Sequence, residues 1–446
     1  MDHPNSLSQG VAVLQNSESD GTMQARKRSW KKILFLSVAV LVILACAVTA
    51  VLVLPSHNEA NPLFKCGVVP YQYGDVYGYA NKNGEIAIQP QFDSAQEFSS
   101  NGMAAVKTGT EYGYINRKGQ YVINPRFEYA SDFSKNGLAY VATDDGYGYI
   151  NKKGEYVIKP RFDSASDFSD IGLAAVRNGE KWGYIDKTGE FIIKPQFSSA
   201  KDFQKNGLAI VKYNDQYGFI NRKGQYVVNP RFDLCEPFSD SGIAAVKKDE
   251  KYGYIDMSGE LITECRFESA SKFADNGLAC VREQGKYGYI NKKGEYVIPP
   301  QFEDATDFSQ SGIAAVQTGE GRRLIDKTGN YVTEDAFDRV VIPSKRANKT
   351  FAAQRDGKWE LIDRHGKTVA QLKCANIVSV YPDGYFIAVN ENKSISVIAS
   401  DGNEVLASID GVRNFIFSQD SICKRSGCFQ LAILDDYCIE HADQSE

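Results

Sequence analysis

A repeat of 35 residues constrains this 446-residue chain more than any other feature of its sequence. An aromatic residue followed by Gly recurs at that spacing without insertion, at Tyr77-Gly78, Tyr112-Gly113, Tyr147-Gly148, Trp182-Gly183, Tyr217-Gly218, Tyr252-Gly253 and Tyr287-Gly288. A second Gly keeps the same register, at Gly84, Gly119, Gly154, Gly189, Gly224, Gly259, Gly294 and Gly329, and so does a Phe, at Phe92, Phe127, Phe162, Phe197, Phe232, Phe267, Phe302 and Phe337. A fixed period of this length is the signature of a repeat architecture.

One unit, residues 172–206, predicts three short strands in an up-down-up meander. Its apolar and aromatic runs are Leu173–Val176, Trp182–Ile185 and Glu190–Ile193, each bounded by turn-forming residues. The whole chain carries 25 Tyr, 24 Phe and 38 Gly, a balance that favours strands and tight turns over helices. In the connector after the third strand, Phe197, Ala200 and Phe203 are expected to point inward as an apolar plug.

The turn before the third strand has a specific chemistry. An Asn or Asp precedes the second Gly by three residues, at Asn116, Asn151, Asp186, Asn221, Asp256, Asn291 and Asp326. Such a side chain bonds the turn backbone, while the Gly takes the positive φ that a type I turn with a bulge requires. Pro residues are expected to end the third strand, because Pro cannot donate to a ladder: Pro90, Pro125, Pro160, Pro195, Pro230 and Pro300.

These residues resemble the bacterial WG-repeat family, whose units carry an aromatic-Gly-aromatic-Ile-Asx core, a Gly turn and a following Pro-x-Phe. The resemblance covers eight units from residue 67 to about residue 346. Only one unit has the family's Trp, the others having Tyr, and the eighth has Arg322-Arg323 in place of aromatic-Gly. Two degenerate units follow, marked by Trp359–Asp363 and Ile395–Ile398. The family implies a repeat protein, often membrane-anchored or secreted, and supplies no catalytic residue.

Three strands per unit cannot bury both of their faces, so neighbouring units must stack. The predicted fold is therefore an all-β repeat protein of stacked three-stranded 35-residue meanders, after one N-terminal transmembrane helix. Propellers typically have four to eight blades of four strands, which ten three-stranded units fit poorly. We therefore expect an open or superhelical array, with a closed propeller as the alternative.

The N-terminal region predicts a membrane anchor. Residues 33–54 form an uncharged apolar run that, as a helix, would span about 33 Å, enough for a bilayer core of about 30 Å. Basic residues precede the run, so the positive-inside rule keeps the N-terminus cytoplasmic and the repeats extracytoplasmic. A cleaved signal peptide or a lipoprotein modified at Cys46 are the alternatives; the core is too long for the first, and apolar residues follow Cys46 where a lipoprotein turns polar.

The predicted organisation is set by these boundaries. It comprises a disordered cytoplasmic tail with a basic end (1–32), the transmembrane helix (33–54), a stalk (55–66), eight regular repeats (67–346), degenerate repeats (347–402) and a C-terminal cap (403–446). The net charge of −5 is too small to imply a nucleic-acid partner.

The units serve as an internal alignment, in which a residue shared by all of them is structural and a catalytic group should be a local departure. The acidic residues after the Phe are shared, and we expect each to bond backbone groups of the connector: Asp93, Glu128, Asp163, Asp233, Glu268, Glu303 and Asp338. Histidines lie outside the regular units, at His3, His57, His365 and His441. Because no phosphate loop, metal motif or triad is found either, we predict no catalytic, cofactor-binding or metal residue and no enzyme activity.

Nine cysteines are distributed unevenly. Cys235, Cys265 and Cys280 replace Ala, Pro and an apolar residue of the repeat, which predicts free thiols in the core. Cys423, Cys428 and Cys438 cluster near the C-terminus, where an exterior location permits one disulfide, with Cys423–Cys428 the nearest pair; a zinc site there would lack one ligand.

Basic residues at the hairpin tips are expected to stack into one ridge: Lys82, Arg117, Lys118, Lys152, Lys153, Lys187, Arg222, Lys223, Lys292, Lys293 and Lys327. The ridge is either a solvated surface or a surface for anionic polymers or acidic proteins. The predicted function is a membrane-anchored, extracytoplasmic binding or scaffolding module whose partner is an unknown protein or cell-wall polymer. A cell-wall carbohydrate binder is a special case of this function.

Overall fold

The computed structural model describes residues 67–81, 85–342, 350–380, 386–391, 395–406 and 412–415. The expected tail, transmembrane helix and stalk (residues 1–66) lie outside this part of the chain, and so do Lys82 and the cysteine cluster Cys423, Cys428 and Cys438. All of the described residues belong to one compact unit, Pro62–Glu446.

The regular secondary structure of the described residues consists of strands, and these make ten sheets that we number 1 to 10 along the chain. Sheet 1 is β1 (Val68–Tyr73), β2 (Val76–Asn81), β3 (Ile86–Phe92) and β38 (Val412–Phe415); sheet 2 is β4 (Ser94–Ala95), β5 (Met103–Thr108), β6 (Glu111–Asn116) and β7 (Tyr121–Phe127); sheet 3 is β8 (Tyr129–Ala130), β9 (Ala139–Thr143), β10 (Gly146–Ile150) and β11 (Tyr156–Phe162); sheet 4 is β12 (Ser164–Ala165), β13 (Ala174–Asn178), β14 (Lys181–Ile185) and β15 (Phe191–Phe197). Sheet 5 is β16 (Ser199–Ala200), β17 (Ala209–Tyr213), β18 (Gln216–Ile220) and β19 (Tyr226–Phe232); sheet 6 is β20 (Leu234–Cys235), β21 (Ile243–Lys248), β22 (Lys251–Asp256) and β23 (Leu261–Phe267); sheet 7 is β24 (Ser269–Ala270), β25 (Leu278–Glu283), β26 (Lys286–Asn291) and β27 (Tyr296–Phe302). Sheet 8 is β28 (Ile313–Thr318) and β29 (Gly321–Asp326); sheet 9 is β30 (Arg339–Val341), β31 (Thr350–Arg355), β32 (Lys358–Asp363) and β33 (Thr368–Gln371); sheet 10 is β34 (Asn376–Val380), β35 (Phe386–Val389), β36 (Ile395–Ile398) and β37 (Glu404–Leu406).

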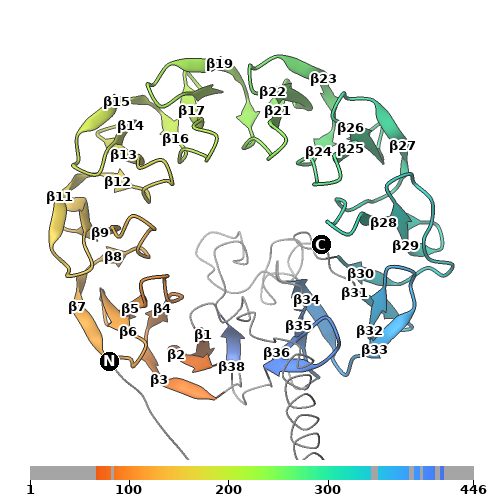
Figure 1. Ribbon diagram of the computed structural model, residues 1–446, viewed down its shortest axis with the longest axis horizontal. Helices are drawn as coiled ribbons and strands as arrows, with labels where there is room; N and C mark the ends of the chain where they lie inside the picture. The colour runs from red at the N-terminus through yellow and green to blue at the C-terminus, as the bar shows by residue number, and fades with distance from the viewer. Residues whose placement is uncertain are drawn as a thin grey trace, which may run out of the picture. The chain divides into compact units, whose positions relative to one another are not determined.

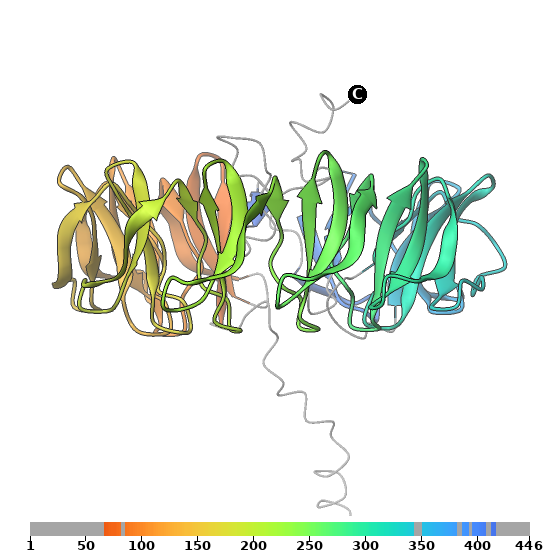
Figure 2. The same cartoon turned by 90° about the horizontal axis from the view of Figure 1, so that it is seen from above.

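The sheets stand side by side around a ring, as a β-propeller does (Figure 1). Seen edge-on, the ring is a single layer of upright sheets (Figure 2). The preferred expectation of an open array is therefore wrong, and the alternative of a closed propeller is correct. The strand that closes the ring is β38, which pairs antiparallel with β1 through Tyr71↔Phe415 and Gln72↔Asn414.

The expectation of three strands per unit is also wrong, because most sheets have four. The additional strand has only two residues and comes from the connector of the preceding unit; in sheet 4, Ser164 pairs with Arg177 and Ala165 with Val176. In sheet 1 this innermost place beside β1 is occupied by β38. A strand from the far end of the described chain thus completes the first sheet.

The apolar core lies in the seams between neighbouring sheets. In sheet 4, Tyr184 packs with Phe203 of the following connector (ring centroids 4.7 Å apart), while Ile185 belongs to the cluster around Tyr149 of sheet 3. The alternation along β14 therefore sends successive side chains into opposite seams. The predicted inward plug is confirmed, since Phe197 and Phe203 are both buried.

The predicted turns are confirmed as well. In the turn after β10, the side-chain Oδ1 of Asn151 accepts hydrogen bonds from the backbone N–H of Lys153 (2.9 Å) and Glu155 (3.1 Å). Gly154 closes this turn with φ +80°. An added Cβ there would also lie 3.2 Å from Ile123 of the preceding sheet, so the turn seals a seam.

The prolines do not end the outer strand, contrary to the sequence-based expectation. Pro160 lies inside β11, where the pairing with β10 shifts so that Tyr147 faces Phe162 and Tyr149 faces Ile158. The two extra residues form a bulge over Gly148. A Cβ at Gly148 would be 2.6 Å from both the Ile158 carbonyl oxygen and the Pro160 nitrogen, so the bulge leaves no room for a side chain.

The seal between this glycine and the bulge generates a first prediction. Gly148→Ala should lower the free energy of unfolding by roughly 1–3 kcal/mol, because the new methyl group overlaps backbone atoms that cannot move independently. Gly253→Ala is the matched control, because sheet 6 has Cys265 in place of Pro and its nearest backbone atoms would be 2.9–3.0 Å away. Calorimetric melting of both variants checks the ranking; equal melting temperatures would contradict it.

Candidate functional site

Polar contacts recur from sheet to sheet in the regular part of the ring. The Arg161 guanidinium donates to the Gly189 carbonyl oxygen of the next turn (2.6 Å), and Arg126 and Arg231 bond Gly154 and Gly259 in the same way. The shared acidic residues also bond backbone groups, as predicted, although the donors lie in the following hairpin turn: the Gly179 N–H donates to Asp163 (2.6 Å). These contacts are structural, so candidate sites are places where the sheets differ.

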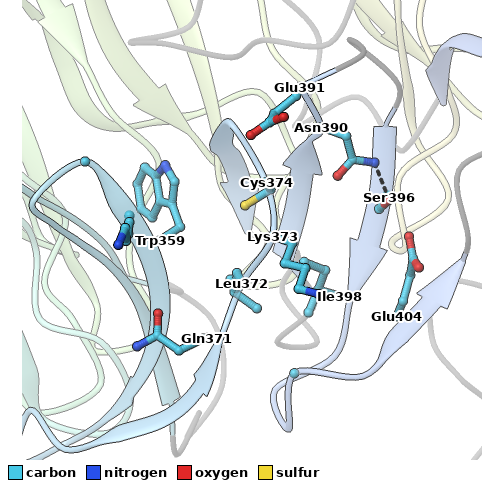
Figure 3. Close-up of a pocket in the computed structure, with 13 residues that line it drawn as sticks. Trp359, Gln371, Leu372, Lys373, Cys374, Asn390, Glu391, Ser396, Ile398 and Glu404 are labelled. Atoms are coloured by element: carbon cyan, nitrogen blue, oxygen red, sulfur yellow. Dashed lines mark hydrogen bonds between the residues drawn. The ribbon is translucent and has the colours of Figure 1, made fainter.

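A cavity of about 1000 Å³ lies where the units are most degenerate, between sheets 9 and 10 (Figure 3). Its lining combines apolar, amide and charged side chains with backbone: Gly357, Lys358, Trp359, Gln371, Leu372, Lys373, Cys374, Asn390, Glu391, Ser396, Ile398, Gly402 and Glu404. Figure 3 shows the Trp359 indole on one side and Asn390, Ser396 and Glu404 on the other, with Leu372 and Cys374 between them. Cavities of this size hold small molecules.

Trp359 is the most unusual group in this lining. Its side chain is fully buried, and within the described residues its indole Nε1–H has no hydrogen-bond acceptor. The Arg339 guanidinium lies 5.7 Å from the centre of the ring, and the Leu372 N–H bonds the Trp359 carbonyl oxygen at 2.9 Å. The ring is therefore held in place while its donor stays unsatisfied. Burying an unpaired donor costs free energy unless a partner is supplied.

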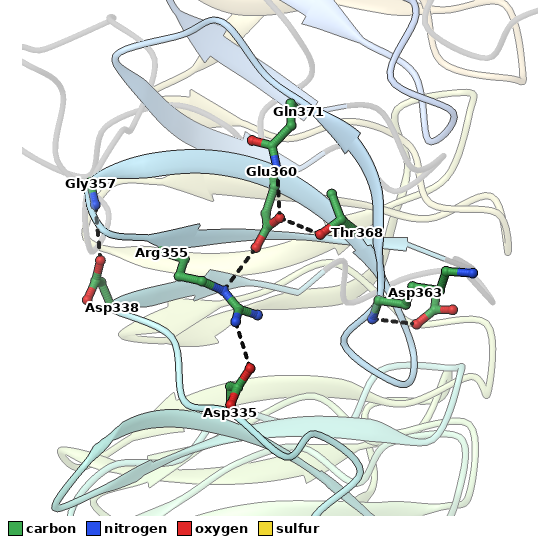
Figure 4. Close-up of polar contacts among 9 residues, drawn as sticks. Asp335, Asp338, Arg355, Gly357, Glu360, Asp363, Thr368 and Gln371 are labelled. Carbon is green, nitrogen blue, oxygen red and sulfur yellow. Dashed lines mark hydrogen bonds and ion pairs between the residues drawn. The ribbon is translucent and has the colours of Figure 1, made fainter.

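Glu360 occupies the place that the Gly of the aromatic-Gly pair has in the regular units. Its buried carboxylate accepts hydrogen bonds from Thr368 Oγ1 (2.7 Å) and Gln371 Nε2 (3.0 Å) of β33 (Figure 4). It also pairs with Arg355 Nε at 3.3 Å, and Arg355 in turn donates to Asp335 at 2.7 Å. The hydrogen bond to Asp335 is the main cause that raises the pKa of Arg355. The network fixes Gln371, which also lines the cavity.

A second departure lies along the inner edge of sheets 2 to 5. Ser166 Oγ donates to the Asp202 carboxylate of the next connector at 2.5 Å, and Ser131 bonds Asp167 at 3.4 Å. The position before Asp132 in this series holds Gln96, whose amide bonds the Ala130 carbonyl oxygen instead (3.4 Å). Asp132 Oδ1 is consequently left without a hydrogen-bond partner among the described residues.

Burial is the main cause that raises the pKa of Asp132 to about 7, with the charges of Asp167 and Glu97 adding to it. Burial likewise raises the pKa of Asp167 to about 6, where the charge of Asp202 adds and the bond from Ser131 opposes. A seam between sheets 2 and 4 therefore holds carboxylates that ionise reluctantly.

Sheet 3 differs from its neighbours in its aromatic content. Tyr129 and Tyr140 stand where other units have small residues, and their rings stack with centroids 5.5 Å apart and 23° between planes. Tyr112 and Tyr147 flank them at 5.8 and 6.2 Å. In sheet 2 the corresponding contact is Lys107 over the Tyr112 ring, so the cluster replaces a cation–ring contact by ring–ring packing.

The basic tips occupy equivalent turns, between the third and outer strands, and therefore one face of the ring. Those within the described residues are all exposed: Arg117, Lys118, Lys152, Lys153, Lys187, Arg222, Lys223, Lys292, Lys293 and Lys327. Of the predicted core thiols, Cys235 and Cys280 are buried and Cys265 is half-buried, and all three are free. The double-arginine unit forms the two-stranded sheet 8, where Arg322 pairs with Asp304.

No cluster of three or more metal-binding side chains occurs in the part of the chain that the structure describes. Within the same residues, no helix has the length and apolar character needed to cross a bilayer. His365 is exposed on the turn after β32. Sequence analysis missed the cavity. The available signal was Trp359-Glu360, where a buried acid replaces a glycine.

The unpaired carboxylate generates a second prediction. Because the pKa of Asp132 is about 7 in the folded protein against an ordinary 3.8, the folded state binds the proton more tightly and this group destabilises the fold as pH rises from 4 to 8. Asp132→Asn should therefore raise the melting temperature at pH 8, change it little near pH 4, and flatten the curve between them.

Asp186→Asn is the control, because Asn fills the same turn position at Asn151. The bond from Thr188 is the main cause that lowers the pKa of Asp186, so its stabilisation is present above 3.8 and is lost as pH falls through the lowered value. This variant should therefore lose stability at pH 8, the opposite sign. Parallel melting curves for wild type and Asp132→Asn at all pH values would contradict the assignment.

Among solved structures, the chain is similar to one titled "Crystal structure of the eukaryotic initiation factor" (12% identity, TM-score 0.43, covering 78% of this chain and 97% of that one). It is also similar to apo AztD from Citrobacter koseri (12%, 0.31, 77% and 93%) and to the dihydro-heme d1 dehydrogenase NirN (12%, 0.31, 62% and 74%). No curated protein matches the sequence.

The model of the family described as "WG containing repeat" matches seven consecutive segments: residues 77–109, 112–146, 147–182, 182–217, 217–252, 252–287 and 287–321. Together the segments cover more than half of the chain. Each later segment begins at the aromatic residue of an aromatic-Gly pair, whose glycine the outer-strand bulge requires. The chain belongs to the WG-repeat family.

Proposed function

We propose that this protein is a membrane-anchored binding module whose propeller lies outside the cytoplasm and captures a ligand between sheets 9 and 10. The observation that supports binding is the cavity of about 1000 Å³, walled by a fully buried Trp359 with an unsatisfied donor. The regular sheets, in contrast, use their shared polar groups in contacts with one another. A rigid ring that is specialised in one arc suits recognition.

The anchor is inferred from sequence. The apolar run 33–54 is long enough to span a bilayer, and Arg26, Lys27 and Arg28 precede it on the side that the positive-inside rule keeps cytoplasmic. This orientation puts the repeats on the opposite side, where a cell-wall polymer or another envelope component is accessible.

Protease accessibility tests the proposed topology. Protease added to intact cells should remove a tag placed after residue 446 and spare one placed before residue 1, because only the repeats are accessible. Permeabilised cells serve as the control, in which both tags should be lost. Loss of the N-terminal tag from intact cells would reverse the orientation.

An anionic polymer is the second candidate ligand, favoured by the circle of exposed basic turns. Full-length protein immobilised in detergent should retain a component of the cell envelope. If the cavity holds it, Glu404→Ala should weaken retention and the double variant Lys152→Glu/Lys153→Glu should not. If the basic face holds it, the pattern should reverse and retention should fall with salt. Lys159→Glu on the outer strand β11 is the charge-matched control. Retention of nothing by wild type would contradict the binding function.

A further inference from the structure

We propose that the cavity between sheets 9 and 10 binds an uncharged saccharide, whose hydroxyl groups satisfy the Trp359 indole N–H and the polar groups on the facing wall. The proposal rests on the binding function above and names the class of ligand for that site. Three properties of the lining support it: an unpaired donor, mixed hydrogen-bonding groups and balanced charge.

The unpaired donor requires an acceptor atom in the ligand. Trp359 cannot rotate to find one, because it is fully buried between the Arg339 guanidinium and the β32–β33 ladder. The indole N–H is a donor only, so the ligand must present a lone pair to it. This excludes a purely apolar ligand, which would leave the donor unsatisfied.

The rest of the lining contains acceptors as well as donors. Glu391 and Glu404 carry carboxylates that are acceptors only, whereas the Lys358 and Lys373 ammonium groups are donors only. A hydroxyl group both donates and accepts, so one ligand rich in hydroxyls can serve both kinds of wall. Leu372, Cys374 and Ile398 supply an apolar strip against which the C–H face of a sugar ring can pack.

The charges of the lining favour a neutral ligand. Two lysines oppose two glutamates, so neither an anionic nor a cationic ligand gains from all four groups. A polyanion instead finds a more favourable surface on the basic turns. The site therefore differs in its chemistry from the basic face, and the two are separable by experiment.

The cavity walls are held before any ligand arrives. Gln371 is fixed by its hydrogen bond to the buried Glu360, and Asn390 Nδ2 donates to Ser396 Oγ at 2.8 Å. Groups that are fixed in advance lose less conformational entropy on binding. Glu360 is thus a positioning residue, present where the regular units have only glycine.

Tryptophan fluorescence tests the proposal in the full-length protein in detergent, with maltotetraose and N,N′,N″,N‴-tetraacetylchitotetraose as probes. The chain has three Trp residues, of which Trp182 lies in the regular sheet 4 and Trp359 at the cavity. At least one probe should produce a saturable change in emission that persists in Trp182→Phe. Trp359→Phe removes the indole N–H and should weaken binding at least tenfold by calorimetry.

Glu404→Ala provides a second variant, because Glu404 is exposed and its loss leaves the packing of the sheet intact. It should also weaken binding, with an unchanged melting temperature. No saturable binding of either probe, or equal affinity in wild type and both cavity variants, would overturn the proposal. Binding of polyphosphate alone would overturn it too. If the protein still retains an envelope component in the capture experiment, the binding function stands and only the saccharide assignment fails.

Discussion

The regular sheets depend on one steric constraint, the contact between the glycine of the aromatic-Gly pair and the bulge of the outer strand. At Gly183 an added Cβ would lie 2.5 Å from the Ile193 carbonyl oxygen and 2.7 Å from the Pro195 nitrogen. The bulge twists the outer strand and places Pro on the exposed edge, where its missing N–H reduces pairing with other chains. The aromatic neighbour, the turn and the seam packing all assume this geometry.

The exceptions within the chain support this dependence. Sheet 8 has Arg323 in place of the glycine, and there the outer strand is reduced to the isolated bridges Arg322↔Phe337 and Ile325↔Tyr331. Sheet 9 has Glu360, and its outer strand pairs without the two-residue bulge. Where the glycine is replaced, the bulge is absent, and polar side chains enter the space between neighbouring sheets. The cavity lies in this irregular part of the ring.

Local features were predictable from the sequence because each is specified within a few residues. The strand alternation at Trp182–Ile185, the turn at Asn151–Gly154 and the plug at Phe203 all result from short-range chemistry. Closure was not predictable, because it depends on small rotations between sheets that add up around the ring. The two-residue innermost strands, such as Ser164–Ala165, have no pattern of their own. The site was missed for a related reason: a cavity between two degenerate units has no repeat against which to recognise it.

Closure by β38 also determines the order in which the molecule can fold. Most contacts join strands adjacent in sequence, so individual sheets can form as the chain emerges from the ribosome. The pairing of Tyr71 with Phe415 joins residues separated by nearly the entire repeat region, and its loop-closure entropy is correspondingly large. Until residues 412–415 have been synthesised, the inner edge of β1 lacks its partner. An incomplete ring therefore presents an open strand edge to chaperones, to other nascent chains and to proteases, and synthesis of the final segment removes it.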